Sequence, residues 1–380
     1  MNTIYLDHAA TTPMDSEVIS AMSAAMVEVY GNASSIHQAG RASRKYLDEA
    51  RHTLAKSIGA HPNEIILTSG GTEADNMAII GVAKARANEG KHIITSSVEH
   101  HAVLHACELL EKEGFDVTYL PVDETGKVSV DTVKAALRDD TILVTIMYGN
   151  NEVGTIQPIQ EIGTLLKNHT ALFHTDAVQA YGLEEINVDA LGVDYLSVSA
   201  HKINGPKGIG FLYAKSKRPL TNLLVGGSQE KKRRAGTENV PAVIGFAKAV
   251  ERAELTREAK RVEFTKYKDL LIRKFSEAGI TFSINGALQN SLPHVLNVSF
   301  DGTDVESFLI NLDMAGVLVS SGSACTAGAV DPSHVLVAMY GENAPQLRSS
   351  IRFSFGQGLT EEQIEQAAER TISIVKRLVK

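Results

Sequence analysis

Seven short apolar runs, separated by helix-like stretches, constrain the fold of this 380-residue chain more than any other feature. Strands that alternate with helices predict βαβ units and a mostly parallel sheet. The run Thr141-Ile142-Leu143-Val144 is typical of a strand covered on both faces. The predicted strands are residues 65–68, 92–96, 117–120, 142–147, 171–175, 195–199 and 210–213.

Composition and charge exclude several classes of protein. With 43% hydrophobic and 22% charged residues, the chain can bury a large core, so a disordered protein is not expected. Its formal net charge of −8 argues against general, sequence-independent binding of nucleic acid. The two cysteines, Cys107 and Cys325, are too few for a disulfide scaffold. No secretory signal or membrane span is visible, so we expect a cytoplasmic protein.

The pattern of the chain changes after about residue 250. An amphipathic helix is predicted over residues 259–275, and Thr360 with Gln363 fits a capping box at the start of the last helix. At roughly 150 residues per domain, two domains are expected. They are a large unit of residues 14–258 and a smaller α+β unit formed by residues 1–13 and 259–380.

The first motif that carries chemistry is Thr68-Ser69-Gly70-Gly71-Thr72-Glu73, directly after a predicted strand. Two glycines let the backbone approach a ligand, and the free N–H groups of a helix start suit a phosphate. Taken alone, the motif fits an ordinary strand-to-helix turn equally well.

The second motif is His174-Thr175-Asp176-Ala177-Val178-Gln179, just past another apolar run. A carboxylate at the C-terminal end of a strand in an open α/β sheet faces the ligand crevice. Taken alone, Asp176 is better interpreted as the cap of the next helix.

The third motif is Ser199-Ala200-His201-Lys202, which leads into a glycine-rich turn. Most lysines are solvated on the surface. A lysine at the end of a buried strand is different, because a lysine withheld from water loses proton affinity and becomes a nucleophile toward carbonyls. We therefore favour Lys202 as a functional residue.

A phosphate cup, an aspartate and a lysine, in this order, are what pyridoxal phosphate chemistry needs. Their details resemble the class V aminotransferase family, and most closely its cysteine desulfurases. The resemblance runs from residue 5 to about residue 360 and implies an α/β enzyme of fold type I with a mostly parallel seven-stranded sheet. The other matching strings are Tyr5-Leu6-Asp7-His8-Ala9-Ala10-Thr11-Thr12-Pro13, Gly31-Asn32-Ala33-Ser34-Ser35, Glu99-His100, Asn150-Asn151-Glu152-Val153-Gly154, Arg234-Ala235-Gly236-Thr237, Ser321-Gly322-Ser323-Ala324-Cys325 and Ile351-Arg352-Phe353.

The resemblance implies a role for each residue around pyridoxal 5'-phosphate. Lys202 would form the Schiff base, and Asp176 would pair with the pyridinium nitrogen. His100 would stack on the ring, with its neighbour His101 as the rival for that role. Gln179 would donate to the phenolic oxygen. The residues implied for the phosphate are Gly71, Thr72, Ser199, His201 and, from the second subunit of a homodimer, Thr237.

The resemblance also implies how the substrate is held and attacked. Asn151 and Arg352 would hold L-cysteine, since the planar fork of an arginine binds both oxygens of a carboxylate. Cys325 resembles the nucleophile that takes the sulfur as a persulfide. Its segment carries no charge between Asp313 and Asp331, which fits a nucleophile that must travel. Cys107, in a helical stretch, is interpreted as core packing.

Sulfur would then pass to an acceptor protein, and the long segment from Cys325 to Arg352 resembles the type that serves iron–sulfur cluster assembly and tRNA thiolation. A class V transaminase, a selenocysteine lyase and a non-catalytic sulfur carrier stay open as alternatives. No metal site is predicted, because Ala102 stands where the His101/His105 pair would need a glutamate. The basic run at residues 231–234 is interpreted as a solvated loop, so direct binding of nucleic acid is not expected.

Overall fold

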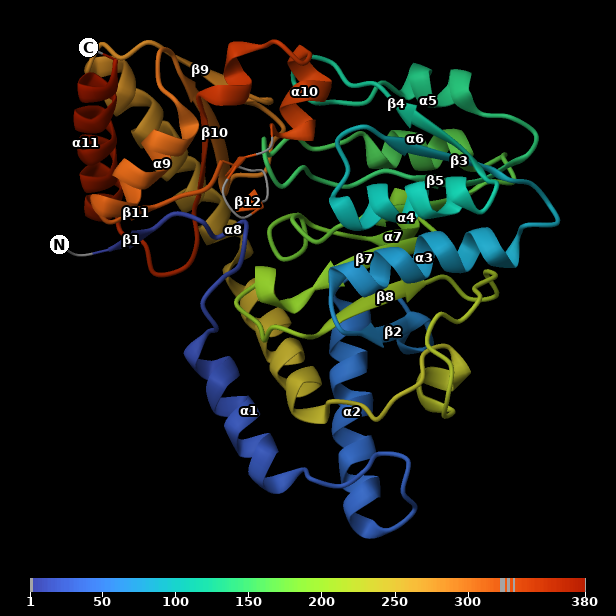
Figure 1. The fold of residues 1–380 in the computed structure, drawn as a ribbon. Helices are drawn as coiled ribbons and strands as arrows, with labels where there is room; N and C mark the ends of the chain where they lie inside the picture. The colour runs from blue at the N-terminus through green and yellow to red at the C-terminus, as the bar shows by residue number, and fades with distance from the viewer. Residues whose placement is uncertain (1–2, 322–324, 327–328, 331, 380) are drawn as a thin grey trace.

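The computed structural model describes residues 3–321, 325–326, 329–330 and 332–379, and the side chains of all of these except 325–326 and 329–330. Its centre is a seven-stranded sheet with the order β2-β8-β7-β6-β5-β3-β4 (Figure 1). Only β8 runs antiparallel to its neighbours, so the mostly parallel sheet predicted from the sequence is confirmed. The strands are β2 (Ile65–Thr68), β3 (His92–Ser96), β4 (Asp116–Leu120), β5 (Thr141–Thr145), β6 (Leu172–Asp176), β7 (Tyr195–Ser199) and β8 (Gly210–Ala214).

Helices cover both faces of this sheet, as the continuous apolar strands require. Alternate strand residues point to opposite faces, so Ile66 packs in one core cluster, while Ile65 and Leu67 pack in another. One face is covered by α3 (Gly71–Ala85) and α4 (His101–Lys112). The other is covered by α2 (Gln38–Lys56), α5 (Val130–Ala136), α6 (Ile159–Leu166) and the first half of α8 (Val240–Glu277). Two further helices of this part are α1 (Ser16–Glu28) and α7 (Val188–Leu191).

A separate core brings the N-terminal strand together with the C-terminal part of the chain. Its antiparallel sheet has the order β14-β10-β9, and β1 pairs with β11 beside it (Figure 1). Phe275, Phe300 and Phe353 form an aromatic cluster within this core. Its elements are β1 (Ile4–Tyr5), β9 (Phe282–Asn285), β10 (Val295–Phe300), α9 (Val305–Met314), β11 (Val317–Leu318), β14 (Ser350–Ser354) and α11 (Glu361–Leu378). Between β11 and β14 the chain also forms β12 (Cys325–Thr326), β13 (Ala329–Val330) and α10 (His334–Tyr340).

One long helix connects the two cores. The sequence predicted a helix over residues 259–275, but α8 starts 19 residues earlier, at Val240, and spans about 57 Å along its 38 residues. The first half of α8 is rich in Ala, Val and Gly, because it packs closely against its neighbours. A Cβ at Gly245, for example, would lie 2.5 Å from Met22 of α1. The proposed boundary after residue 258 falls inside this helix and stays a prediction.

Within the part of the chain that the structure describes, no helix is long and apolar enough to cross a membrane.

Candidate active site

A cavity of about 340 Å³ opens at the carboxyl ends of the parallel strands. In open α/β sheets this edge is where ligands bind. Its lining includes residues from motifs that are far apart in the sequence. Ten residues predicted for the site line it, namely Gly71, Thr72, His100, Asn151, Asp176, Gln179, Ser199, His201, Lys202 and Arg352.

Lys202 lies just past β7, at the end of a short 3₁₀ turn. Its Nζ donates to the carbonyl oxygens of Ala9, at 2.5 Å, and Ala10, at 2.8 Å. Burial, and then the nearby Arg352, lowers the pKa of this amine to about 8. Near neutral pH a fraction of Lys202 is therefore unprotonated and can act as a nucleophile or base.

The N-terminus of α3 forms one end of the cavity. Its N-cap residue is Gly70, and no side chain caps this 15-residue helix, so its first N–H groups are available to a ligand. A Cβ at Gly71 would lie 2.8 Å from Cγ2 of Val178, so this position needs a glycine. Ser199 and His201 line the cavity as well. These donors suit a phosphate.

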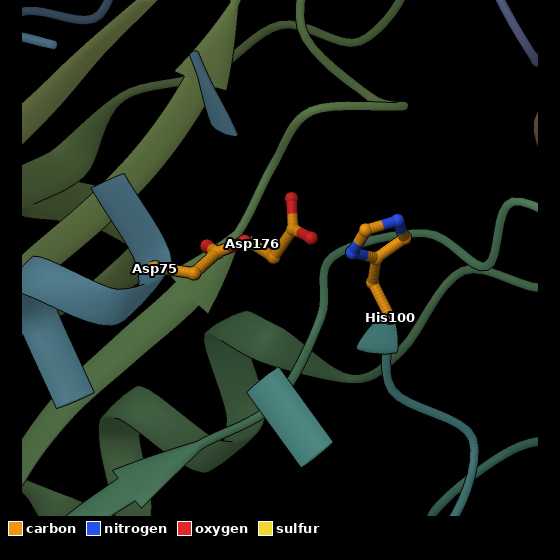
Figure 2. Close-up of side chains that lie close together, drawn as sticks. All are labelled: Asp75, His100 and Asp176. Atoms are coloured by element: carbon orange, nitrogen blue, oxygen red, sulfur yellow. The ribbon is translucent and has the colours of Figure 1, made fainter. Parts of the chain in front are cut away.

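Two buried carboxyl groups and one imidazole converge in the cavity. Asp176, at the end of β6, and Asp75, on α3, lie with His100 so that one ligand atom of each is within 4.8 Å of the others (Figure 2). Oδ1 of Asp176 accepts a hydrogen bond from the backbone N–H of Val178 at 2.9 Å. Burial raises the pKa of Asp176 to about 6. Asp176 therefore places a carboxylate where the protonated ring nitrogen of a ligand could pair with it.

Asp75 holds its proton more firmly than Asp176. It is 1% exposed, and burial, followed by repulsion from Asp176, raises its pKa well above the usual range. Its Oδ1 has no hydrogen-bond partner, and Nε2 of His174 lies 3.6 Å from that oxygen. Burial lowers the pKa of His174 to about 3, so this imidazole is neutral. Like charges this close in a dry site cannot both ionise, so Asp75 is the protonated member of the pair.

Glu99 is a further buried carboxyl beside the cavity. Its Oε1 accepts from Ser96 at 2.5 Å and from the backbone of Met147 at 3.0 Å, while Oε2 has no partner. Burial raises its pKa to about 8. The sequence motifs predicted a role for neither Asp75 nor Glu99, although both lie close to motif residues: Glu99 directly precedes His100, and Asp75 lies one helical turn after Gly71.

His100, and not its neighbour His101, lines the cavity. Nδ1 of His100 accepts from the backbone of Ala102 at 3.1 Å and caps α4. Burial, and then Lys202, lowers the pKa of His100 to about 4, so the ring is neutral. The ring of His101 lies 5.1 Å from that of His105 and 4.7 Å from that of His334.

Two hydrogen bonds fix the orientation of the Gln179 side-chain amide at the cavity. Its Nε2 donates to the carbonyl oxygen of Ala9 at 3.0 Å, and its Oε1 accepts from Nε2 of the buried His294 at 3.1 Å. The same carbonyl of Ala9 accepts from Lys202. Sequence reasoning gave His294 no role.

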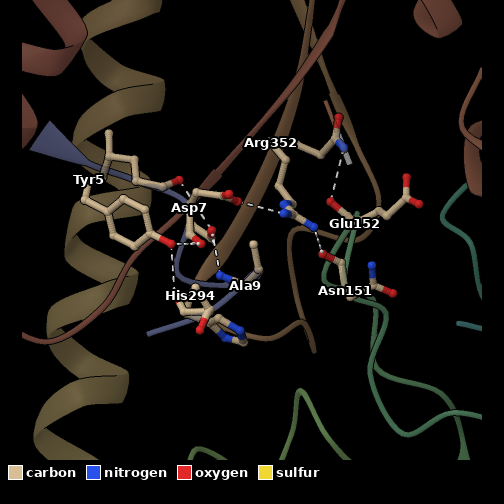
Figure 3. Close-up of polar contacts among 12 residues, drawn as sticks. Tyr5, Asp7, Ala9, Asn151, Glu152, His294 and Arg352 are labelled. Atoms are coloured by element: carbon tan, nitrogen blue, oxygen red, sulfur yellow. Dashed lines mark hydrogen bonds and ion pairs between the residues drawn. The ribbon is translucent and has the colours of Figure 1, made fainter. Parts of the chain in front are cut away.

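Arg352, on β14, approaches the cavity from the second core (Figure 3). Its Nη2 pairs with Oδ1 of Asp7 at 2.8 Å, and its Nη1 donates to the carbonyl oxygen of Asn151 at 2.9 Å. Nε of Arg352 is buried without a partner. A buried guanidinium with a donor to spare suits a carboxylate ligand.

The remaining two predicted site residues are Thr237 and Cys325. Thr237 is exposed, in the loop before α8, and does not line the cavity. Cys325 belongs to the short strand β12, which pairs with β13, but its side chain lies outside what the structure describes. Cys107 is fully buried in the core beside α3, as predicted.

Comparisons with known proteins give the family. The sequence profile named aminotransferase class-V matches residues 4–367. A putative cysteine desulfurase IscS of Bacillus subtilis is 59% identical, with 100% of both chains covered. The cysteine desulfurase IscS of Dictyoglomus turgidum is 50% identical over 99% of this chain and 94% of that protein. A solved structure titled NifS-like protein, 35% identical, superposes with a TM-score of 0.93 over 99% of this chain and 100% of its own. The chain therefore belongs to the class V aminotransferase family, and within it to the cysteine desulfurases.

Proposed function

We propose that this enzyme uses pyridoxal 5'-phosphate to convert L-cysteine to L-alanine and leaves the sulfur as a persulfide on Cys325. The observation that carries the proposal is the convergence of Lys202, Asp176 and Arg352 on one cavity. An amine of lowered pKa, a carboxylate and a carboxylate-binding guanidinium are the groups that this reaction uses.

The residues present fit the cofactor. The uncapped start of α3, with Gly71, Thr72, Ser199 and His201, would hold the phosphate, and Thr237 would reach it from a second subunit. Asp176 would face the ring nitrogen, His100 the ring and Gln179 the phenolic oxygen. Lys202 would hold the aldehyde. The bound group would supply a ring that accepts the electron pair left on Cα when its proton is removed.

Protein groups bind the substrate and move its protons. Arg352 binds the carboxylate of L-cysteine and, together with Asn151, orients it. Lys202 takes the Cα proton, because its lowered pKa leaves part of it neutral. His100 is neutral as well and can pass protons between the substrate and solvent.

The sulfur step needs no external oxidant or reductant. The thiolate of Cys325 attacks the substrate sulfur, an S–S bond forms, and the C–S bond breaks. The electron pair of the C–S bond remains with Cβ, which takes a proton. L-Cysteine and the thiol of Cys325 thus become L-alanine and a persulfide, with the same atoms on both sides.

The proposal also includes a sulfur-acceptor protein, a second subunit and a separate role for each of the two units of the chain. The persulfide passes to an acceptor protein, in iron–sulfur cluster assembly or tRNA thiolation, and the enzyme works as a homodimer in the reducing cytoplasm. The large unit, residues 14–258, holds the cofactor. The small unit, residues 1–13 and 259–380, contributes Arg352 and Cys325.

The proposal is tested by incubating the holoenzyme with L-cysteine and measuring its intact mass with and without a reductant. A reductant-sensitive gain of one sulfur that maps to Cys325, with L-alanine in solution, is expected. Cys325→Ser should keep the bound cofactor and lose this gain.

The alternatives give other products. Amino-group transfer without sulfur release would indicate a transaminase, and reaction with selenocysteine alone a selenium lyase. A protein that binds no cofactor would indicate a sulfur carrier.

A further inference from the structure

Ser333, eight residues after Cys325, contacts Glu152, which directly follows Asn151 of the candidate site. The Ser333 hydroxyl donates to Oε2 of Glu152 at 2.5 Å, and its oxygen accepts from the backbone N–H of Leu336 at 3.1 Å, which caps α10. Ser333 and Glu152 are 4% and 2% exposed. A buried hydrogen bond to a carboxyl group is strong, and losing it leaves a buried polar group unpaired.

Glu152 lies beside the residues that would hold the substrate. It follows Asn151, whose carbonyl oxygen accepts from Arg352 at 2.9 Å. Its own carbonyl oxygen accepts from Nδ2 of the buried Asn297 at 3.1 Å, which fixes its backbone. The Ser333–Glu152 hydrogen bond therefore ties the end of the Cys325 segment to the substrate site.

A second contact runs from the next residue to the other side of the cavity. Nε2 of His334 donates to the carbonyl oxygen of Glu99 at 2.8 Å, directly before His100. An apolar cluster completes the docking of α10, with half of its residues from the large sheet region and half from α10. Its buried members are Val98, Met147, Val153, Val335, Leu336 and Met339.

The other end of the segment is tied to the same place. Ser320 and Arg352 exchange backbone hydrogen bonds, with N···O distances of 2.6 and 3.3 Å. Cys325 lies five residues after Ser320 and eight before Ser333. A fully extended chain therefore keeps its Cα within about 18 Å of Ser320 and about 29 Å of Ser333. Both anchors lie next to the substrate site, so they set where the thiol can go.

We propose that Ser333, through its hydrogen bond to Glu152, is a positioning residue for sulfur transfer, which places Cys325 relative to the substrate. This inference rests on the function proposed above. Ser333 does not line the cavity, so it acts on the sulfur step and not on the proton chemistry of Lys202.

Two measurements on the holoenzyme separate these steps. Exchange of the Cα hydrogen of L-alanine in D₂O, followed by NMR, reports proton removal without Cys325. Persulfide formation with L-cysteine, followed by intact mass at quenched times, reports the sulfur step. Ser333→Ala should slow persulfide formation about tenfold, which corresponds to the loss of one buried hydrogen bond. The same variant should keep the rate of Cα-hydrogen exchange within about twofold of the wild type.

A matched control separates the hydrogen bond from the helix cap. Ser129 caps α5, which has seven residues like α10, and Ser129 is exposed and makes no bond to Glu152. Ser129→Ala should change neither rate, and Ser333→Thr, which keeps the hydroxyl, should restore persulfide formation. If Ser333→Ala does not fold, Ser333→Gly removes the hydroxyl at little cost to the cap, with the same expected tenfold loss.

Three results would overturn the positioning role. They are a wild-type rate of persulfide formation in the variants without the hydroxyl, an equal loss of exchange and persulfide formation, and no rescue by Ser333→Thr. A wild-type enzyme that exchanges L-alanine but never gains sulfur overturns the proposed function itself, and the positioning role with it.

Discussion

The cavity is bounded by two regions that handle charge in opposite ways. We call Lys202, Asp176, Asp75 and Glu99 the floor, because they lie on or just beyond the elements of the large sheet. We call Arg352, Asp7 and Asn151 the wall. In the floor, burial shifts each pKa toward the neutral form. In the wall, Arg352 keeps a carboxylate partner at 2.8 Å.

The difference fits the role that we propose for each region. A group that takes and returns protons works best when its pKa lies near the working pH, and burial achieves this for Lys202. A group that only binds a carboxylate needs a permanent charge, and arginine keeps its charge at any physiological pH. The floor is therefore suited to proton transfer and the wall to recognition. Substitutions in the two regions should fail in different ways.

The largest effect is expected at Lys202. Lys202→Ala removes the group that we propose as both the anchor of the cofactor and the base, so the rate of L-alanine formation should fall by about 10³-fold or more. The visible absorbance of the bound cofactor, measured on the purified protein, should be lost too. Lys207→Ala, a lysine five residues away and exposed, is the control and should change neither. A Lys202→Ala protein that keeps the yellow colour of the bound cofactor would contradict the proposed role of Lys202 as its anchor.

The second prediction separates the two carboxyl groups of the floor. Asp176→Asn removes the charge expected to face the ring nitrogen and should lower kcat about 10²-fold, measured as L-alanine formed per bound cofactor. Asp75→Asn resembles the protonated carboxyl that the structure indicates, so its loss should be far smaller. Equal losses in the two variants would mean that Asp75 is ionised, and that the floor carries two charges.

The third prediction concerns the wall. Arg352→Ala removes the charged fork, so the KM for L-cysteine should rise about 10- to 100-fold, while the cofactor absorbance stays as in the wild type. Arg352→Lys should recover part of the loss, because an ammonium keeps the charge but not the two-pronged geometry. Steady-state kinetics at saturating cofactor measures both. Loss of cofactor from Arg352→Ala would show that wall and floor are not separate.

Much of this arrangement could be predicted from the sequence. Strand periodicity located seven strands, three of them at the observed bounds, and the capping box at Thr360 with Gln363 is present. Motif residues at strand ends meet because the carboxyl ends of parallel strands share one edge. Asp75 and Glu99 were missed because their role depends on burial, which only packing decides. Asp7 was missed as the partner of Arg352 because 345 residues separate them.

The smallest effect is expected on stability, at Glu99. The pKa of Glu99 is about 8 in the folded protein against 4.5 ordinarily, so between these pH values the folded chain holds a proton that the unfolded chain releases. This difference lowers the free energy of unfolding as the pH rises through that window. Glu99→Gln keeps an acceptor for Ser96 and has no charge to bury. Thermal unfolding should place its Tm above the wild type by about 2 °C or more at pH 8, and by less at pH 5. The exposed Glu28→Gln should show no such difference. An equal rise in Tm at both pH values would show that the effect comes from packing, and would contradict the raised pKa of Glu99.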